Sequence, residues 1–223
     1  MELRLDLHIH SERSFDGCMS LSEIVALARE RGLNGVAICD HDRVLDEVPE
    51  FDDFLVIPAT EVSTERGHLL GLFVREPIET RKFSESVTAI HAQGGLAVIA
   101  HPFEHSTDAN RLDDVMSRLD GVEIWNSRAD RKNKSANAMA RELAQKWKKP
   151  VTAGSDAHVP EEVGGGVTVL EADELSLSAV KAALLRGAKR LHAPHRARED
   201  GRAHLRDDVR RRPDGPSRIA RPI

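Results

Sequence analysis

The chain has 223 residues, of which 40% are hydrophobic and 31% charged, and its formal net charge is −5 at pH 7. This length fits a single domain, because α/β barrels often use ~200–250 residues as one unit. No apolar run approaches the ~20 residues needed to span a bilayer, and the N-terminus lacks the pattern of a signal peptide. Two cysteines, Cys18 and Cys39, are too few for a disulfide framework or a thiolate zinc site. We therefore expect a cytoplasmic protein without membrane contact.

The charge is unevenly distributed. Residues 188–223 hold 11 basic and 5 acidic side chains, a local net charge of +6, whereas the preceding 187 residues carry a net charge of −11. Apolar periodicity also ends after Leu191, and such a composition cannot repay the entropy of ordering. We predict a folded domain over 1–192 and an Arg-rich disordered tail over 193–223. The acidic domain argues against nucleic-acid binding through the core, and leaves weak contact through the tail open.

Short apolar segments alternate with amphipathic ones along the chain. Six or seven such units indicate a parallel sheet covered by helices, and a seven-strand or distorted (β/α) barrel fits this length better than an eight-fold barrel. An open doubly wound sheet is the alternative, although no glycine-rich nucleotide loop supports it. In chain order we predict strand 3–9, helix 20–31, strands 34–39, 54–59 and 69–74, helix 84–93, strand 96–100, helix 110–119, strand 122–125, helix 134–147, strand 151–154 and helix 175–186.

Histidine and carboxylate residues concentrate at the ends of these strands. The chain has 11 histidines beside only eight aromatic residues, with no tyrosine. At the carboxyl ends of barrel strands, side chains converge on one site, and imidazole with carboxylate is the ligand set of Zn, Mn and Fe. So many ligands around one mouth imply more than one metal ion. The candidates are His8, His10, His41, Glu61, His68, His101, Asp156 and His158, of which His68 begins a strand rather than ending one.

Each motif by itself is weak, because a lone histidine is usually a surface or core residue. We read His91, His105, His192, His195 and His204 in that way, and expect Glu123 and Trp125 of the sixth strand to pack or face solvent. The conjunction of His8-x-His10 with Asp156-x-His158 and three further ligands after apolar strands favours a metal site.

Neither cysteine nor serine competes as a nucleophile. Cys39 ends an apolar strand and reads as a core residue, and Ser155 lacks the Gly-x-Ser-x-Gly elbow. Clustered divalent ions supply a different nucleophile, because they lower the pKa of bound water toward ~7 and neutralise phosphate charge. Metal-assisted hydrolysis is the predicted reaction class.

Five motifs resemble, in order, those of the PHP (polymerase and histidinol phosphatase) superfamily. The segment 8–17, His-Ile-His-Ser-Glu-Arg-Ser-Phe-Asp-Gly, is similar to the opening motif, and 38–42 to the second, with Cys39 where threonine is common. Residues 61–63 with 67–71, then 100–102 and 154–158, resemble the remaining regions, so that the match spans about 3–190.

The resemblance implies a distorted (β/α)7 barrel with two or three divalent ions (Mn, Zn or Fe). It adds Asp16, which spacing alone reads as a turn residue. The implied ligands are His8, His10, Glu61 and Asp156 for a first ion, Glu61, His68 and His101 for a second, and Asp16, His41 and His158 for a third.

We therefore expect a stand-alone metal-dependent phosphoesterase, hydrolysing a small phosphomonoester such as a nucleotide. The catalytic groups would be a metal-bound hydroxide, Glu61 and Asp156, with Arg128 first among the candidates for holding phosphate, ahead of Arg13, Arg131 and Lys132. Three alternatives remain: an amidohydrolase-type metallohydrolase, a non-enzymatic metal-binding domain, and a nuclease or phosphodiesterase acting on nucleic-acid ends.

Overall fold

The structure is a computed structural model that describes residues 1–106, 108 and 112–192. The proposed tail, 193–223, lies outside the described residues, so its disorder stays a prediction. In chain order the elements are β1 (Glu2–Ile9), α1 (Leu21–Glu30), β2 (Gly35–Ile38), β3 (Leu55–Thr64), β4 (Gly67–Leu72), α2 (Phe83–Ala92), β5 (Leu96–Ile99), a 3-10 turn (Met116–Arg118), β6 (Gly121–Asn126), α3 (Ser127–Lys132), α4 (Ala136–Trp147), β7 (Val151–Gly154), a second 3-10 turn (Pro160–Glu162), β8 (Val167–Glu171), α5 (Leu177–Arg186) and β9 (Arg190–His192).

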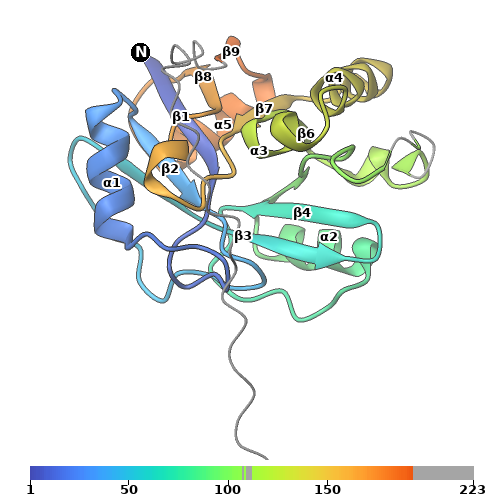
Figure 1. Cartoon of the computed structure of the whole chain (residues 1–223), viewed down its shortest axis with the longest axis horizontal. Helices are drawn as coiled ribbons and strands as arrows, with labels where there is room; N and C mark the ends of the chain where they lie inside the picture. Colours follow the sequence, from blue (N-terminus) through green and yellow to red (C-terminus); the bar gives the residue numbers. More distant parts are fainter. Residues whose placement is uncertain (107, 109–111, 193–223) are drawn as a thin grey trace, which may run out of the picture.

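The strands form one curved sheet, which closes almost into a barrel. Their order is β7-β6-β5-β4-β3-β2-β1-β8-β9, and the segment after β7 returns to β1. There the Asp156 amide donates to the His8 carbonyl at 2.8 Å, and the His10 amide donates to the Ala157 carbonyl at 2.9 Å. Figure 1 shows α1 and α4 on opposite sides of the molecule, with the β3–β4 hairpin between them and below. The predicted distorted barrel is confirmed, with β1 to β8 as its eight strands.

The sheet departs from the predicted all-parallel arrangement at two strands. β4 is antiparallel to both β3 and β5, and β8 is antiparallel to β1. Only two residues separate β3 from β4, and a loop that short can join only antiparallel strands. β8 and β9 were not among the predicted strands. The predicted α-helix 110–119 is also wrong over its described part, 112–119, where the backbone forms turns and 3-10 conformation.

The helices cover the sheet with the apolar faces that their sequences predict. α1 begins with a capping box, in which the Ser20 hydroxyl accepts from the Glu23 amide while the Glu23 carboxylate accepts from the Ser20 amide. Its buried Ile24 and Ala28 pack in one cluster with Val36 of β2. A second cluster joins α2 and α4 to β4, β5 and β6, and a third joins α5 to the strands around β1. These layers hold the carboxyl ends of β1, β2, β5 and β7 in place.

β1 carries core leucines and a candidate ligand on opposite faces, and its pairing is irregular near the end. The register of β1 against β2 shifts between Asp6 and Ile9. Leu5 and Leu7 belong to one apolar cluster, whereas Ile9 belongs to another. Successive side chains of a strand point to opposite faces of the sheet, so Leu3, Leu5 and Leu7 share one face and His8 lies on the other.

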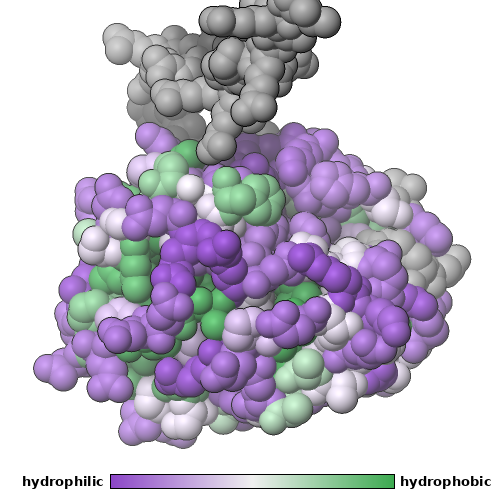
Figure 2. All heavy atoms as spheres, turned by 90° about the horizontal axis from the view of Figure 1, so that it is seen from below, coloured by the Kyte–Doolittle hydropathy of each residue, from purple (hydrophilic) through white to green (hydrophobic). Residues whose placement is uncertain are grey.

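The surface is mainly hydrophilic. On the face drawn in Figure 2, hydrophobic residues form separate small groups among hydrophilic ones. Within the described residues, no helix is both long and apolar enough to cross a membrane. The most exposed large hydrophobic side chain in that part of the chain is Phe15, which is 86% exposed.

Candidate metal centre

All nine predicted ligand residues lie together at one end of the barrel. They form four overlapping groups, in each of which the donor atoms lie within 4.8 Å of one another. The ligands come from β1 and the loop after it, from the segments after β2, β5 and β7, and from the β3–β4 hairpin. The groups are His10–Asp16–His41–His158, His8–His10–Asp156, His8–Glu61–His101 and His41–Glu61–His68.

Glu61 is the centre of this arrangement. Its carboxylate is 1% exposed and contacts five histidine rings through both oxygens. Two rings face Oε1, each at 2.8 Å, and three face Oε2 at 3.2–3.4 Å. A carboxylate in this position can bridge two ions. The five rings are His68 and His101 on Oε1, and His8, His10 and His41 on Oε2.

Asp156 completes the deepest group. Its Oδ1 lies 3.2 Å from His10 Nε2 and 3.7 Å from His8 Nε2. The backbone of Asp156 has a φ of 55°, a left-handed conformation that is uncommon outside glycine. This conformation is held by the amide hydrogen bond to β1 described above, and the Asn126 side chain donates to Asp156 Oδ2 at 3.3 Å.

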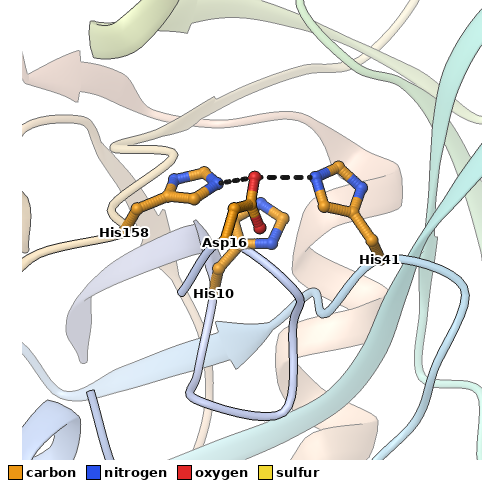
Figure 3. A group of neighbouring side chains, drawn as sticks. All are labelled: His10, Asp16, His41 and His158. Carbon is orange, nitrogen blue, oxygen red and sulfur yellow. Dashed lines mark hydrogen bonds and ion pairs between the residues drawn. The ribbon is translucent and has the colours of Figure 1, made fainter. Parts of the chain in front are cut away.

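A second group lies nearer the surface, around Asp16. Figure 3 shows one oxygen of Asp16 between the rings of His158 and His41, with His10 beside them. Asp16 Oδ2 is 3.0 Å from His158 Nε2 and 3.6 Å from His41 Nε2. The other nitrogen of His158 donates to the Asp156 carbonyl at 2.9 Å, which orients the ring toward Asp16. Ser14 donates to Asp16 Oδ1 at 3.1 Å.

The electrostatics of the site favour cations. Burial by itself would lower the pKa of His10, but hydrogen bonds to Asp156 and Glu61 raise it to about 9. The pKa of His101 is likewise raised to about 9, against the effect of burial, by Glu61. Burial would raise the pKa of Glu61 and of Asp16, yet the surrounding rings hold both pKa values well below their usual range. The ionised carboxylate of Glu61 is thus buried among rings that take up positive charge, and that of Asp16 faces two such rings nearer the surface.

This donor set fits divalent transition ions. Atoms that share one ion with bonds of ~2.0–2.2 Å lie ~3 Å from one another. The nitrogen–oxygen separations around Glu61 and Asp156 run from 2.8 to 3.7 Å. Nitrogen and carboxylate oxygen together are the ligands that Zn, Mn and Fe accept, and the arrangement suits ions held side by side.

A cavity of about 240 Å³ opens beside the donor groups. Among its lining residues are Arg128 and Lys132, two of the predicted phosphate candidates, and the exposed ring of Phe15. The other two candidates are not in its described lining: Arg13 pairs with Asp46, and Arg131 pairs with Glu162.

The structure corrects three sequence-based placements. Glu61 lies inside β3 rather than after it, and His68 lies inside β4 rather than before it. Because β3 and β4 are paired, the two side chains still meet. Glu123 does not simply pack or face solvent: it is 1% exposed, and its Oε1 lies 3.0 Å from His8 Nδ1. No local motif marks Glu123, since its partner is 115 residues away.

Comparison with known proteins identifies the class to which this barrel and its donor cluster belong. A model of the PHP domain matches residues 6–61, and a model of the PHP-associated region matches 134–188. An uncharacterised protein of Methanocaldococcus jannaschii is 33% identical over 166 residues, which cover 65% of this chain and 95% of that protein. The chain belongs to the PHP family, and the predicted family membership is confirmed.

Two further sequence relatives carry functional names. A protein of Shewanella amazonensis, named a probable phosphatase, is 23% identical over 74% of this chain and 80% of its own length. A 5'-3' exoribonuclease of Haemophilus influenzae is 38% identical over 81 residues, 32% of this chain and 29% of that protein.

Solved structures share the fold. A two-domain protein of Bacteroides vulgatus that contains a predicted PHP-like metal-dependent phosphoesterase superposes with a TM-score of 0.66 at 19% identity, covering 86% of this chain and 65% of that one. A lesion-specific endonuclease of Pyrococcus furiosus superposes with a TM-score of 0.62 at 18% identity, covering 86% and 59%. At such identities the likeness establishes the barrel. PHP phosphoesterases use divalent metal ions, and the clusters described here have the composition to bind them.

Proposed function

We propose that the protein is a metal-dependent phosphatase that hydrolyses a small phosphomonoester such as a nucleotide. The proposal rests on one observation: the cavity beside the nine ligand-type side chains is also lined by Arg128 and Lys132. A site of this kind combines cation-binding donors with cationic side chains that can contact phosphate oxygens. The PHP family, which includes metal-dependent phosphoesterases, supports the same reaction class.

Within this proposal the nine residues would hold two or three ions. Glu61, Asp156, His8 and His10 would hold the first, and Glu61, His68 and His101 the second. Asp16, His41 and His158 would hold the third. Divalent ions held there would supply Lewis acidity, lowering the pKa of bound water toward ~7 and neutralising phosphate charge. The four donor groups support this division, although His10 also lies beside the third set and His41 beside Glu61 and His68.

The protein's own side chains would orient the substrate. Arg128 is 31% exposed and 3.9 Å from Glu162, so its guanidinium is restrained without being buried in a tight pair. It can present parallel donors to two phosphate oxygens. Phe15 stacks on the His41 ring with a centroid separation of 5.0 Å and leaves most of its surface open. A planar base is the kind of group that such a ring can stack against.

A phosphatase screen tests the proposal. Protein reconstituted with Mn, Zn or Fe would be assayed for phosphate release from nucleoside monophosphates, bisphosphates, cyclic nucleotides and sugar phosphates, with Glu61→Gln as the inactive control. We expect release from at least one phosphomonoester by the wild-type protein alone. Full metal content without release from any compound would overturn the proposal.

The second candidate is a nuclease acting on nucleic-acid ends. The sequence similarity to a 5'-3' exoribonuclease favours it, although that similarity covers only 81 residues. The same screen should therefore include 5'-phosphorylated oligonucleotides. A kcat/KM for oligonucleotides well above that for mononucleotides would select the nuclease.

A further inference from the structure

Two buried carboxylates outside the nine ligands contact ligand histidines from behind. Glu123 of β6 uses both oxygens: Oε1 lies 3.0 Å from His8 Nδ1, while Oε2 accepts from the His101 amide at 2.9 Å and from Asn126 Nδ2 at 3.0 Å. Glu104, whose side chain is 5% exposed, has Oε2 at 3.2 Å from His101 Nδ1. Each of these rings thus has a carboxylate on Nδ1, while its Nε2 faces Glu61.

The backbone around Glu123 is built to admit this contact. A Cβ at position 154 would lie 2.3 Å from His8 Cβ and 2.8 Å from Glu123 Oε1, so only glycine leaves room for the pair. Asn126 is fixed as well, because its Oδ1 accepts from the Ala129 amide at 2.8 Å and caps α3. Its Nδ2 donates to both Glu123 and Asp156, so Asn126 links Glu123 to the predicted metal ligand Asp156.

We propose that Glu123 and Glu104 are positioning residues that fix the ring tautomers of His8 and His101. An imidazole binds a metal ion only through a nitrogen that carries no proton. A carboxylate on Nδ1 keeps the proton there, which leaves the Nε2 lone pair directed at the site and makes it more basic. This inference shares one assumption with the proposed function, namely that the nine residues bind metal; it does not depend on the substrate.

The chemistry requires an ionised carboxylate at Glu123, not only an acceptor. Three donors converge on its two oxygens, so an amide in its place would set an NH2 group against an N–H group. Loss of such a supporting carboxylate typically costs 10–100-fold in metal affinity. Glu123→Gln should therefore weaken metal binding and release His8 from its single tautomer.

The experiment measures metal affinity and tautomer separately from catalysis. Zinc affinity of the full chain would be measured by chelator competition for the wild type, Glu123→Gln and Glu104→Gln. Glu79→Gln, at an exposed residue, is the control for the same change of charge. Imidazole nitrogen NMR of the zinc-loaded proteins would report which ring nitrogen of His8 and His101 carries the proton.

We expect Glu123→Gln to lose 10–100-fold in affinity and to alter the His8 signals, Glu104→Gln to alter those of His101, and the control to match the wild type. Unchanged affinity and tautomers in both variants would overturn the inference. If Glu123→Gln does not fold, Glu104→Gln, beside the cavity, decides the question by itself. Altered zinc affinity in a protein that hydrolyses no phosphoester would contradict the proposed function and leave this inference standing.

Discussion

The Nε2 atoms of His8 and His10 lie 3.2 Å apart, and both face the same two carboxylate oxygens: Glu61 Oε2 at 3.4 and 3.2 Å, and Asp156 Oδ1 at 3.7 and 3.2 Å. Two buried ring nitrogens at that distance need either a proton or a cation between them. In the metal-free protein the two carboxylates stabilise the protonated form of these rings. A divalent ion bound at the same place would displace the protons. This relationship couples metal binding to pH.

The first prediction concerns that coupling. In the folded, metal-free protein the pKa values of His10 and His101 are raised from 6.5 to about 9, against burial, by their carboxylate partners. Groups with raised pKa values stabilise the fold fully below pH 6.5, and this contribution is lost as the pH rises to 9. We expect the melting temperature of the metal-free protein to fall across pH 6.5–9, as measured by thermal unfolding.

The same protons should be released when metal binds, because a ligand histidine must be neutral. Calorimetry of zinc binding at pH 7 in buffers of different ionisation enthalpy would count them. Zero proton release, together with a melting temperature that does not change over that range, would contradict the protonated state of the metal-free site.

The second prediction concerns metal content. Nine donors in four overlapping groups should hold two or three ions per chain after incubation with Mn or Zn. Because the ions bind the folded state, their removal with a chelator should lower the melting temperature, and their return should restore it. Elemental analysis that finds less than one ion per chain after incubation would exclude a multinuclear centre.

The third prediction concerns Glu61. Glu61→Gln keeps the size of the side chain but removes the charge that faces five histidines, so metal retention and turnover should both fall. We expect a loss of about 3–4 kcal/mol of transition-state stabilisation, the order seen when an electrostatic stabiliser is removed. His158→Ala removes a ring that faces Asp16 and Asp156 but leaves the five rings around Glu61 in place, so it should cost less. A wild-type rate for Glu61→Gln with full metal content would remove the bridging role.

A feature of this molecule can be predicted from its sequence when it depends on residues that are close together in the chain. α1 and α4 follow from local apolar spacing and lie within two residues of the predicted bounds. The segment 110–119 has the same spacing, and its Leu112, Met116 and Leu119 are indeed buried, but over the described residues 112–119 the backbone forms turns and 3-10 conformation. Burial of an apolar face does not by itself determine which helical hydrogen bonds form.

The site divides in the same way. Strand-end position indicated seven ligands, because parallel strands deliver their ends to one place. His68 was a candidate although it was placed at the start of a strand, and Asp16 required the family resemblance. Glu123 and β8 depend on partners far along the chain: β8 pairs with β1, and Glu123 contacts His8. Neither pairing leaves a local pattern, so sequence reasoning missed both.

The last prediction concerns the substrate side of the cavity. Phe15 is 86% exposed beside highly polar groups, and it lines the cavity together with Arg128. If its ring stacks on a base, Phe15→Ala should remove ~1–3 kcal/mol of binding, and 1.4 kcal/mol corresponds to tenfold. We expect KM for a nucleoside monophosphate to rise about tenfold with little change in kcat, while kcat/KM for glycerol phosphate stays constant. Phe51→Ala is the matched control, because Phe51 is another exposed phenylalanine and stacks with Arg29 instead. Equal losses on both substrates would assign Phe15 to the integrity of the Asp16 loop rather than to base recognition.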